Sequence, residues 1–140
     1  MSMMTRVVVP VRYPLTEHSQ ATLAEAISIA RERTAELTVL HVDLYQQGDD
    51  VTRAELKHAV ETAFGSIGRA RYVVRRGFLV EETILEEVAA DDADIVIIGS
   101  KQVSRWRQML RRVIDDPNIE SYLKDKLECA VITVEHDSIE

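Results

Sequence analysis

The chain has 140 residues, the length of one ordinary domain, and its 46% hydrophobic content excludes a disordered protein. A formal net charge of -7 opposes non-specific binding to nucleic acid or to anionic lipid. One cysteine excludes an internal disulfide, and no apolar run approaches the ~20 residues that cross a bilayer. With no signal-peptide pattern at 1–6, we expect a cytoplasmic protein that binds no nucleic acid and does not insert into a membrane.

Strands and amphipathic helices alternate from the start of the chain. The β-branched run at 6–11 and the apolar run at 37–42 are typical of strands that are buried on both faces of a sheet. Between them, apolar residues recur with the period of a helix, at Leu23, Ala26, Ile27 and Ala30. The first third of the chain therefore predicts a strand, a helix and a second strand.

A second helix follows a polar stretch at 46–52. Its apolar stripe has the clearest helical period in the chain, at Leu56, Ala59, Val60, Ala63, Phe64 and Ile67. Residues 71–74 then predict a third strand, which is shorter and more polar than the first two. We therefore place this strand at an edge of the sheet.

The third helix begins after Gly77 and ends in an acidic turn. Its inward face is expected to carry Val80, Ile84, Leu85 and Val88. We expect Asp91, Asp92 and Asp94 to form a solvated turn and not a cation site. Residues 95–98 are the most apolar segment, which predicts a strand near the centre of the sheet.

A further amphipathic segment follows the turn at Gly99 and Ser100. Its apolar stripe consists of Val103, Trp106, Leu110, Val113 and Ile114. Asp116 followed by Pro117 is a helix-start signal, because Asp caps the free amides and Pro needs no donor in the first turn. Residues 130–134 predict a fifth strand, and 135–140 a polar tail.

Basic residues surround Trp106 at Lys101, Arg105, Arg107, Arg111 and Arg112. They allow two interpretations. One is a nucleic-acid or anion site with an aromatic for stacking. The other, which the acidic net charge and the spread of the arginines over several flanks favour, is an amphipathic helix with Trp106 in the core. A small anion near Ser100 and Lys101 stays open as an alternative.

The alternation of strands and helices predicts the fold. Successive strands separated by helices pair in parallel through right-handed crossovers. We therefore expect an α/β protein with one doubly wound, open sheet of five parallel strands and helices on both faces. Residues 1–140 are expected to form a single domain. In such a sheet, ligands bind beyond the carboxyl ends of the strands, where the strand order reverses.

The motifs of common enzyme classes are missing. No G-x-G-x-x-G follows the first strand, and neither a P-loop nor a G-x-S-x-G elbow occurs. The four histidines share no ligand spacing, so no metal site is predicted and His41 is interpreted as structural. Ser19 beside His18 is interpreted as a helix start and not as a catalytic pair. No catalytic residue is assigned.

An ordered set of segments resembles the universal stress proteins. The set consists of Val8-Val9-Pro10-Val11 leading to Glu17-His18-Ser19, then Leu40-His41-Val42, Arg76-Gly77, Asp94 through Ser100, and Cys129 through Val134. Each segment is generic, but their order along nearly the whole chain is specific. The resemblance implies the strand order 3-2-1-4-5 and a cytoplasmic stress-response or regulatory role.

The chain departs from the nucleotide-binding pattern of that family. Members that bind ATP carry G-x-x-G and a later G-[ST], because bare backbone amides must surround the phosphates. Here Gly99 is present, but Gln102 stands at the second glycine position and Arg112 at the third. Arg12 stands where an acidic residue usually faces the ribose. We therefore expect a non-catalytic protein that does not bind ATP in the usual way, and no cofactor.

The alternative is a nucleotide-binding module for ATP or AMP with an altered phosphate loop. The resemblance then implies adenine against Val11 and Val42, with Arg12 beside the ribose. It implies phosphates near Gly99, Ser100, Lys101 and Arg112.

The resemblance also implies a homodimer. In dimers of universal stress proteins, the last strands of the two subunits pair in an antiparallel manner across a two-fold axis. This implies an interface at Val131, Ile132, Thr133 and Val134, an apolar strand without proline that invites pairing if it lies at an edge. An unidentified protein partner is expected, and a membrane transporter is the weaker alternative.

Overall fold

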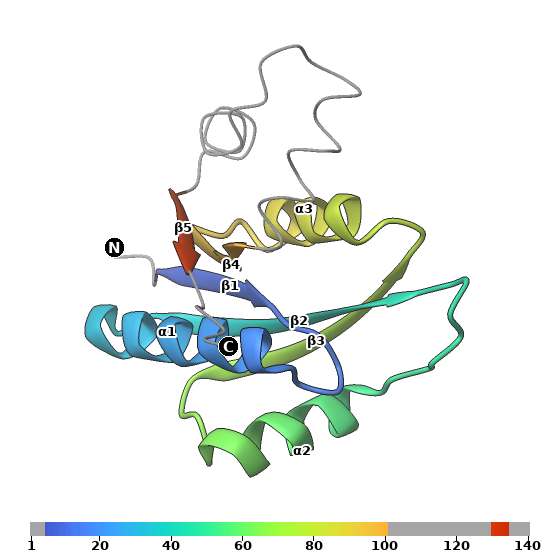
Figure 1. The fold of residues 1–140 in the computed structure, drawn as a ribbon. Helices are drawn as coiled ribbons and strands as arrows, with labels where there is room; N and C mark the ends of the chain where they lie inside the picture. The colour runs from blue at the N-terminus through green and yellow to red at the C-terminus, as the bar shows by residue number, and fades with distance from the viewer. Residues whose placement is uncertain (1–4, 101–129, 135–140) are drawn as a thin grey trace.

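A five-stranded parallel sheet organises the part of the chain that the computed structural model describes, residues 5–100 and 130–134 (Figure 1). The elements in chain order are β1 (Arg6–Pro10), α1 (Glu17–Arg33), β2 (Glu36–Leu44), α2 (Arg53–Phe64), β3 (Ala70–Gly77), α3 (Val80–Ala90), β4 (Ile95–Gly99) and β5 (Ala130–Val134). The strand order is β3-β2-β1-β4-β5, and every neighbouring pair is parallel. The predicted fold class and strand order are confirmed.

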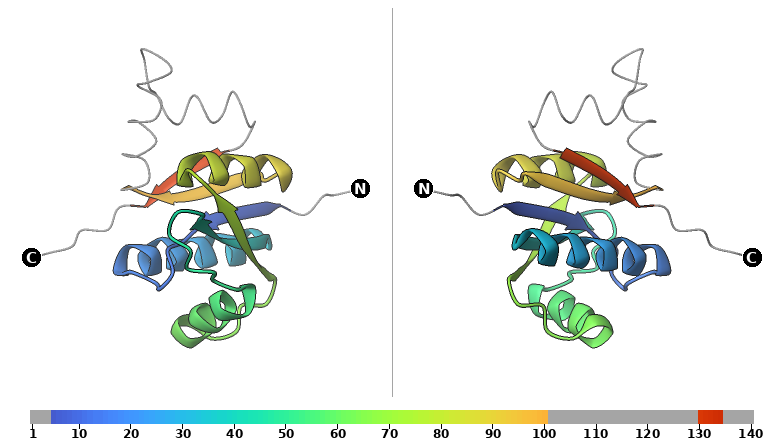
Figure 2. Two further views of the ribbon diagram at one scale, coloured as in Figure 1. Left: turned by 90° about the vertical axis from the view of Figure 1, so that its right-hand side faces the viewer. Right: turned by 90° about the vertical axis from the view of Figure 1, so that its left-hand side faces the viewer.

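The sheet lies between two layers of helix. In Figures 1 and 2, α1 and α2 cover one face and α3 covers the other. The side chains of β1 show the reason, because Val7 and Val9 join the cluster under α1 and α2, whereas Val8 joins the cluster under α3. All three valines are fully buried. Successive side chains of a strand point to opposite faces, so a continuous apolar run predicts burial on both.

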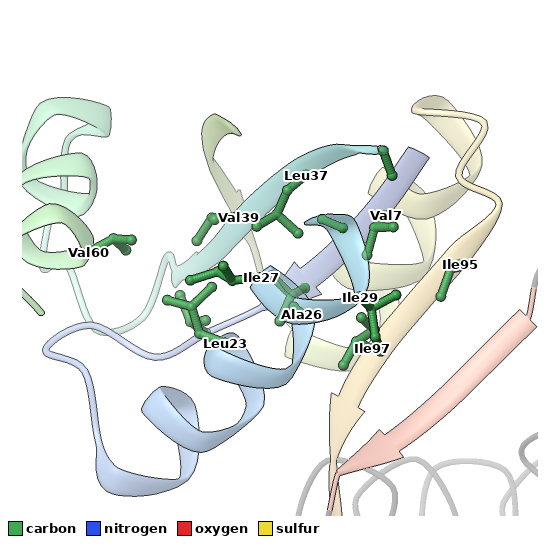
Figure 3. Close-up of a cluster of buried hydrophobic side chains, with 14 of the residues drawn as sticks. Val7, Leu23, Ala26, Ile27, Ile29, Leu37, Val39, Val60, Ile95 and Ile97 are labelled. Atoms are coloured by element: carbon green, nitrogen blue, oxygen red, sulfur yellow. The ribbon is translucent and has the colours of Figure 1, made fainter. Parts of the chain in front are cut away.

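The cluster between α1 and the sheet is the larger of the two (Figure 3). Leu23, Ala26 and Ile27 of α1 pack there against Leu37 and Val39 of β2 (Figure 3). The period of Leu23, Ala26 and Ile27 predicts this face correctly. The helix begins where the hydroxyl of the N-cap Thr16 accepts a hydrogen bond from the Ser19 amide at 3.0 Å.

The third strand is longer than its polarity suggests. It runs over Ala70–Gly77, at the predicted sheet edge, and the following helix begins only at Val80. Tyr72 packs under α2, while Arg71 and Arg75 on the opposite face reach carboxylates of α3. Charged residues extend the strand because their charges are paired across the face of the sheet, which a local hydrophobic pattern does not reveal.

The prediction of a solvated acidic turn is wrong for Asp91. Its side chain is buried and receives a hydrogen bond from the Thr38 hydroxyl at 3.0 Å, and it forms an ion pair with Arg71. Glu87 is buried one turn earlier, with its Oε1 2.7 Å from Arg75 Nε. Buried carboxylates need such partners, and these come from arginines of β3 and from Thr38 of β2. Asp92 and Asp94 are exposed as expected.

Several predictions fall outside the described residues. They are the amphipathic segment around Trp106, the helix start at Asp116, the site residues Lys101 and Arg112, and the tail 135–140. Among the helices that are described, none has the length and apolar character needed to cross a membrane.

Candidate functional site

A cavity of about 410 Å³ lies beyond the carboxyl ends of β1, β2 and β4. The strand order places β1 between β2 and β4, so the cavity sits where the connections leave toward opposite faces of the sheet. This is the position at which parallel α/β sheets bind ligands. Four predicted site residues line it, namely Val11, Arg12, Val42 and Gly99. Ser100 is described but does not line the cavity.

The α3 side of the cavity is apolar. Val42 at the end of β2 packs with Val80 and Ile84 of α3, and all three line the cavity. Ile84 is fully buried, and Val11, which belongs to the cluster under α1, is 6% exposed. The sequence pattern predicts Val80 and Ile84 as core residues only. They reach the cavity because α3 starts after the short connection at 78–79 and packs its first turns against the sheet.

His41 lines the cavity opposite this apolar wall. Its Nδ1 lies 3.1 Å from the carbonyl oxygen of Val11, and its ring meets the edge of Tyr13 with centroids 6.1 Å apart. A carbonyl can only accept, so Nδ1 carries the hydrogen. In the neutral tautomer, Nε2 is then an acceptor. His41 is structural, as expected, but it is also a lining residue that the scattered histidine spacing does not predict.

The first turn of α1 closes a third side. The Ser19 hydroxyl accepts a hydrogen bond from the Arg12 amide at 2.9 Å, and the Ser19 amide is bound to the Thr16 hydroxyl. Ser19 therefore fixes the backbone that follows β1, in agreement with its interpretation as a helix-start residue. Thr22 lies one turn further, and a Cβ at Gly99 would come 3.1 Å from its hydroxyl. Gly99 thus allows the end of β4 to approach α1 closely.

The loop between β2 and α2 forms the outer rim through Gln47 and Asp49. Carboxylates at its two ends are among the groups that hold this loop. Asp43, only 3% exposed, accepts a hydrogen bond from the Val51 amide at 3.1 Å, and Asp50 lies 2.6 Å from Arg76. The other carboxylate oxygen of Asp43 is buried and has no hydrogen-bond partner among the described residues. The sequence does not predict the ion pair between Asp50 and Arg76, because it depends on the register of β2 and β3.

Chemically, the cavity combines an apolar wall, a histidine acceptor and an exposed arginine. In residues 5–100 and 130–134, no group of three or more His, Cys, Asp or Glu side chains could hold a metal ion. The arrangement suits the binding of a small molecule with one flat apolar part and one polar part.

A model described as the universal stress protein family matches residues 3–134. No curated protein sequence is a match.

Solved structures share the fold at low identity. The universal stress protein UspA from Lactobacillus plantarum is 21% identical, with a TM-score of 0.60 over 96% of this chain and 99% of that one. A universal stress protein in complex with cAMP is 16% identical, with a TM-score of 0.67 over 96% and 98%. One from Archaeoglobus fulgidus in complex with dAMP is 22% identical, with a TM-score of 0.58 over 95% and 98%.

Proposed function

This chain belongs to the universal stress protein family, and we propose that it is a non-catalytic, dimeric regulatory protein of the cytoplasm that binds an adenine nucleotide. The observation that carries the proposal is the cavity beyond β1, β2 and β4. Its volume of about 410 Å³ falls in the range typical of small-molecule sites. Two solved structures of the same fold are complexes with cAMP and dAMP.

The walls of the cavity suit an adenine base. A flat aromatic ring gains most from burial against apolar side chains, which Val11, Val42 and Val80 provide. In the tautomer set by its bond to the Val11 carbonyl, His41 offers Nε2 as an acceptor for the exocyclic amine. A hydrogen bond of this kind distinguishes adenine from bases without an amine at that position.

The mode of phosphate binding differs from that of an ATP-binding relative. By the resemblance to that family, Gln102 and Arg112 stand at two of the three glycine positions, and a side chain at such a position opposes close contact between backbone amides and phosphate. Gly99 is kept at the end of β4. We therefore expect a monophosphate such as AMP to bind more tightly than ATP, with or without magnesium.

The proposal of a non-catalytic role rests on the side chains at the site. The Ser19 hydroxyl accepts from the Arg12 amide and belongs to the capped end of α1. No described group suits a metal. A regulatory protein of this type acts through its surface, and we propose a homodimer through Val131, Ile132, Thr133 and Val134, with residues 1–140 as one domain.

Calorimetric titration with AMP and with ATP tests the nucleotide proposal. We expect saturable binding of AMP in the micromolar range and weaker binding of ATP. A Val42→Trp variant fills the cavity and should abolish binding. Val73→Trp is the matched control, because Val73 packs against the same cluster but does not line the cavity. No heat at two temperatures, or unchanged binding by Val42→Trp, would contradict the proposal.

A further inference from the structure

We propose that Arg12 makes this cavity selective for nucleotides that carry a phosphate on the 2′,3′ edge of the ribose, an inference that rests on the nucleotide proposal above. Arg12 lines the cavity, is exposed, and follows β1 after Val11. A guanidinium group binds phosphate through two parallel, charge-assisted hydrogen bonds, whereas a ribose hydroxyl gives it only one neutral partner.

The strand order suggests how a nucleotide would be oriented in the cavity. The apolar wall lies on the β2 side, at Val42 and Val80, and it is the place for the base. Gly99 at the end of β4 lines the opposite side of the cavity, and we assign a 5′ substituent to that side. β1 lies between β2 and β4, so the sugar of such a ligand passes over the end of β1, where Arg12 stands.

The backbone of Arg12 is fixed while its side chain is available. The Arg12 amide is bound to the Ser19 hydroxyl at 2.9 Å, which holds the residue at the cavity. Within residues 5–100 and 130–134, the guanidinium of Arg12 forms no ion pair. In contrast, Arg71, Arg75 and Arg76 each pair with a carboxylate. Among the described residues, Arg12 is therefore an unpaired cation at the place that we assign to the sugar.

The other charges around the cavity support an anionic group at this place. Among the described lining residues, the one acidic side chain is Asp49, which belongs to the loop after β2 and so lies on the side of the base. His18 stands with Arg12 on the α1 side. The charge of the lining thus favours a second negative group on the sugar, away from the base.

Calorimetry with adenosine, 5′-AMP, 2′-AMP, 3′-AMP and 3′,5′-cyclic AMP at low salt tests the inference. In the wild type, the affinity for 2′-AMP or 3′-AMP should be at least about tenfold higher than the affinity for adenosine. Arg12→Ala should reduce this ratio to about one, because it weakens binding of the 2′ and 3′ phosphates far more than binding of adenosine, and Arg12→Asp should reverse the preference. Arg33→Ala is the control. Arg33 is also an exposed arginine, but it lies in the last turn of α1 and does not line the cavity.

The outcomes separate the two proposals. Binding of adenosine and 5′-AMP without any advantage for a 2′ or 3′ phosphate would overturn the role of Arg12 and leave nucleotide binding intact. An advantage that persists in Arg12→Ala would also overturn it. If none of the five compounds binds, both proposals fall. Thermal melting should show that Arg12→Ala folds normally, since the bond to Ser19 comes from the backbone amide.

Discussion

The two edge strands of the sheet, β3 and β5, differ in the charge that their side chains carry. β3 and β5 each have one hydrogen-bonded neighbour among the described residues, so each leaves one row of backbone groups for other partners. β3 carries three arginines, of which Arg71 and Arg75 pair with α3 and Arg76 pairs with Asp50. β5 carries no charge at all.

The difference in charge between β3 and β5 indicates which edge can pair with another chain. An arriving strand at β3 would meet half-exposed guanidinium groups on both faces, with the side chains of Arg71, Arg75 and Arg76 between 51% and 56% exposed. Such charges oppose pairing between strands. At β5, an incoming strand would meet only Ala, Val, Ile and Thr. The comparison supports β5, and not β3, as the surface of the proposed homodimer.

The largest effect should come from a charge placed on β5. Ile132→Lys should convert the proposed dimer to a monomer, because two lysines would face each other across the two-fold axis. Light scattering with size-exclusion chromatography measures the mass. Val74→Lys on β3 is the matched control, since Val74 and Ile132 are both partly buried against the same cluster. A dimer that survives Ile132→Lys, or one that only Val74→Lys dissociates, would contradict the interface.

A smaller effect should follow from removing a charge under β3. Asp91→Asn removes the ion pair with Arg71 and weakens the bond from Thr38, and we expect a loss of about 2 kcal/mol in the free energy of unfolding. The value is modest because the Arg71 side chain is 55% exposed and water can solvate it. Urea denaturation measures the change. Asp92→Asn, the exposed neighbour, should change stability by less than about 0.5 kcal/mol. Equal effects of the two variants would show that the burial and pairing of Asp91 contribute nothing to stability.

The smallest effect concerns a single hydroxyl on β3. Burial raises the pKa of the Tyr72 hydroxyl above its ordinary value of 10.0, and the charge of Glu61 raises it further. The oxygen has no hydrogen-bond partner among the described residues. Because the folded-state pKa is the higher one, the stability linked to neutral Tyr72 is present below pH 10 and is lost as the pH rises through the folded-state pKa.

Tyr72→Phe should therefore leave stability near neutral pH almost unchanged and reduce its decline above pH 10. Urea denaturation at a series of alkaline pH values measures this slope. Tyr45→Phe is the control, because Tyr45 is exposed and is not expected to alter the alkaline decline. An identical alkaline decline in wild type and Tyr72→Phe would refute the link to this hydroxyl.

Much of the fold follows from local patterns. The apolar runs at β1, β2 and β4 predict buried strands, and the helical period of α1 predicts its inward face. The alternation of these elements predicts a parallel sheet. In the candidate site, Val11, Val42 and Gly99 could be predicted because parallel strands end at one edge of the sheet, and Arg12 because it follows the first strand.

Only the tertiary structure decided the rest. His41, Val80 and Asp49 reach the cavity from three separate elements, and nothing in their spacing marks them as neighbours. Asp91 is buried because Arg71 of β3 and Thr38 of β2 meet it across the face of the sheet. The sequence by itself determined the described strands and helices and their order along the chain, because hydrophobic periodicity is local. Whether a charge or a histidine is buried, paired or turned toward a ligand depends on partners that only chain folding brings together.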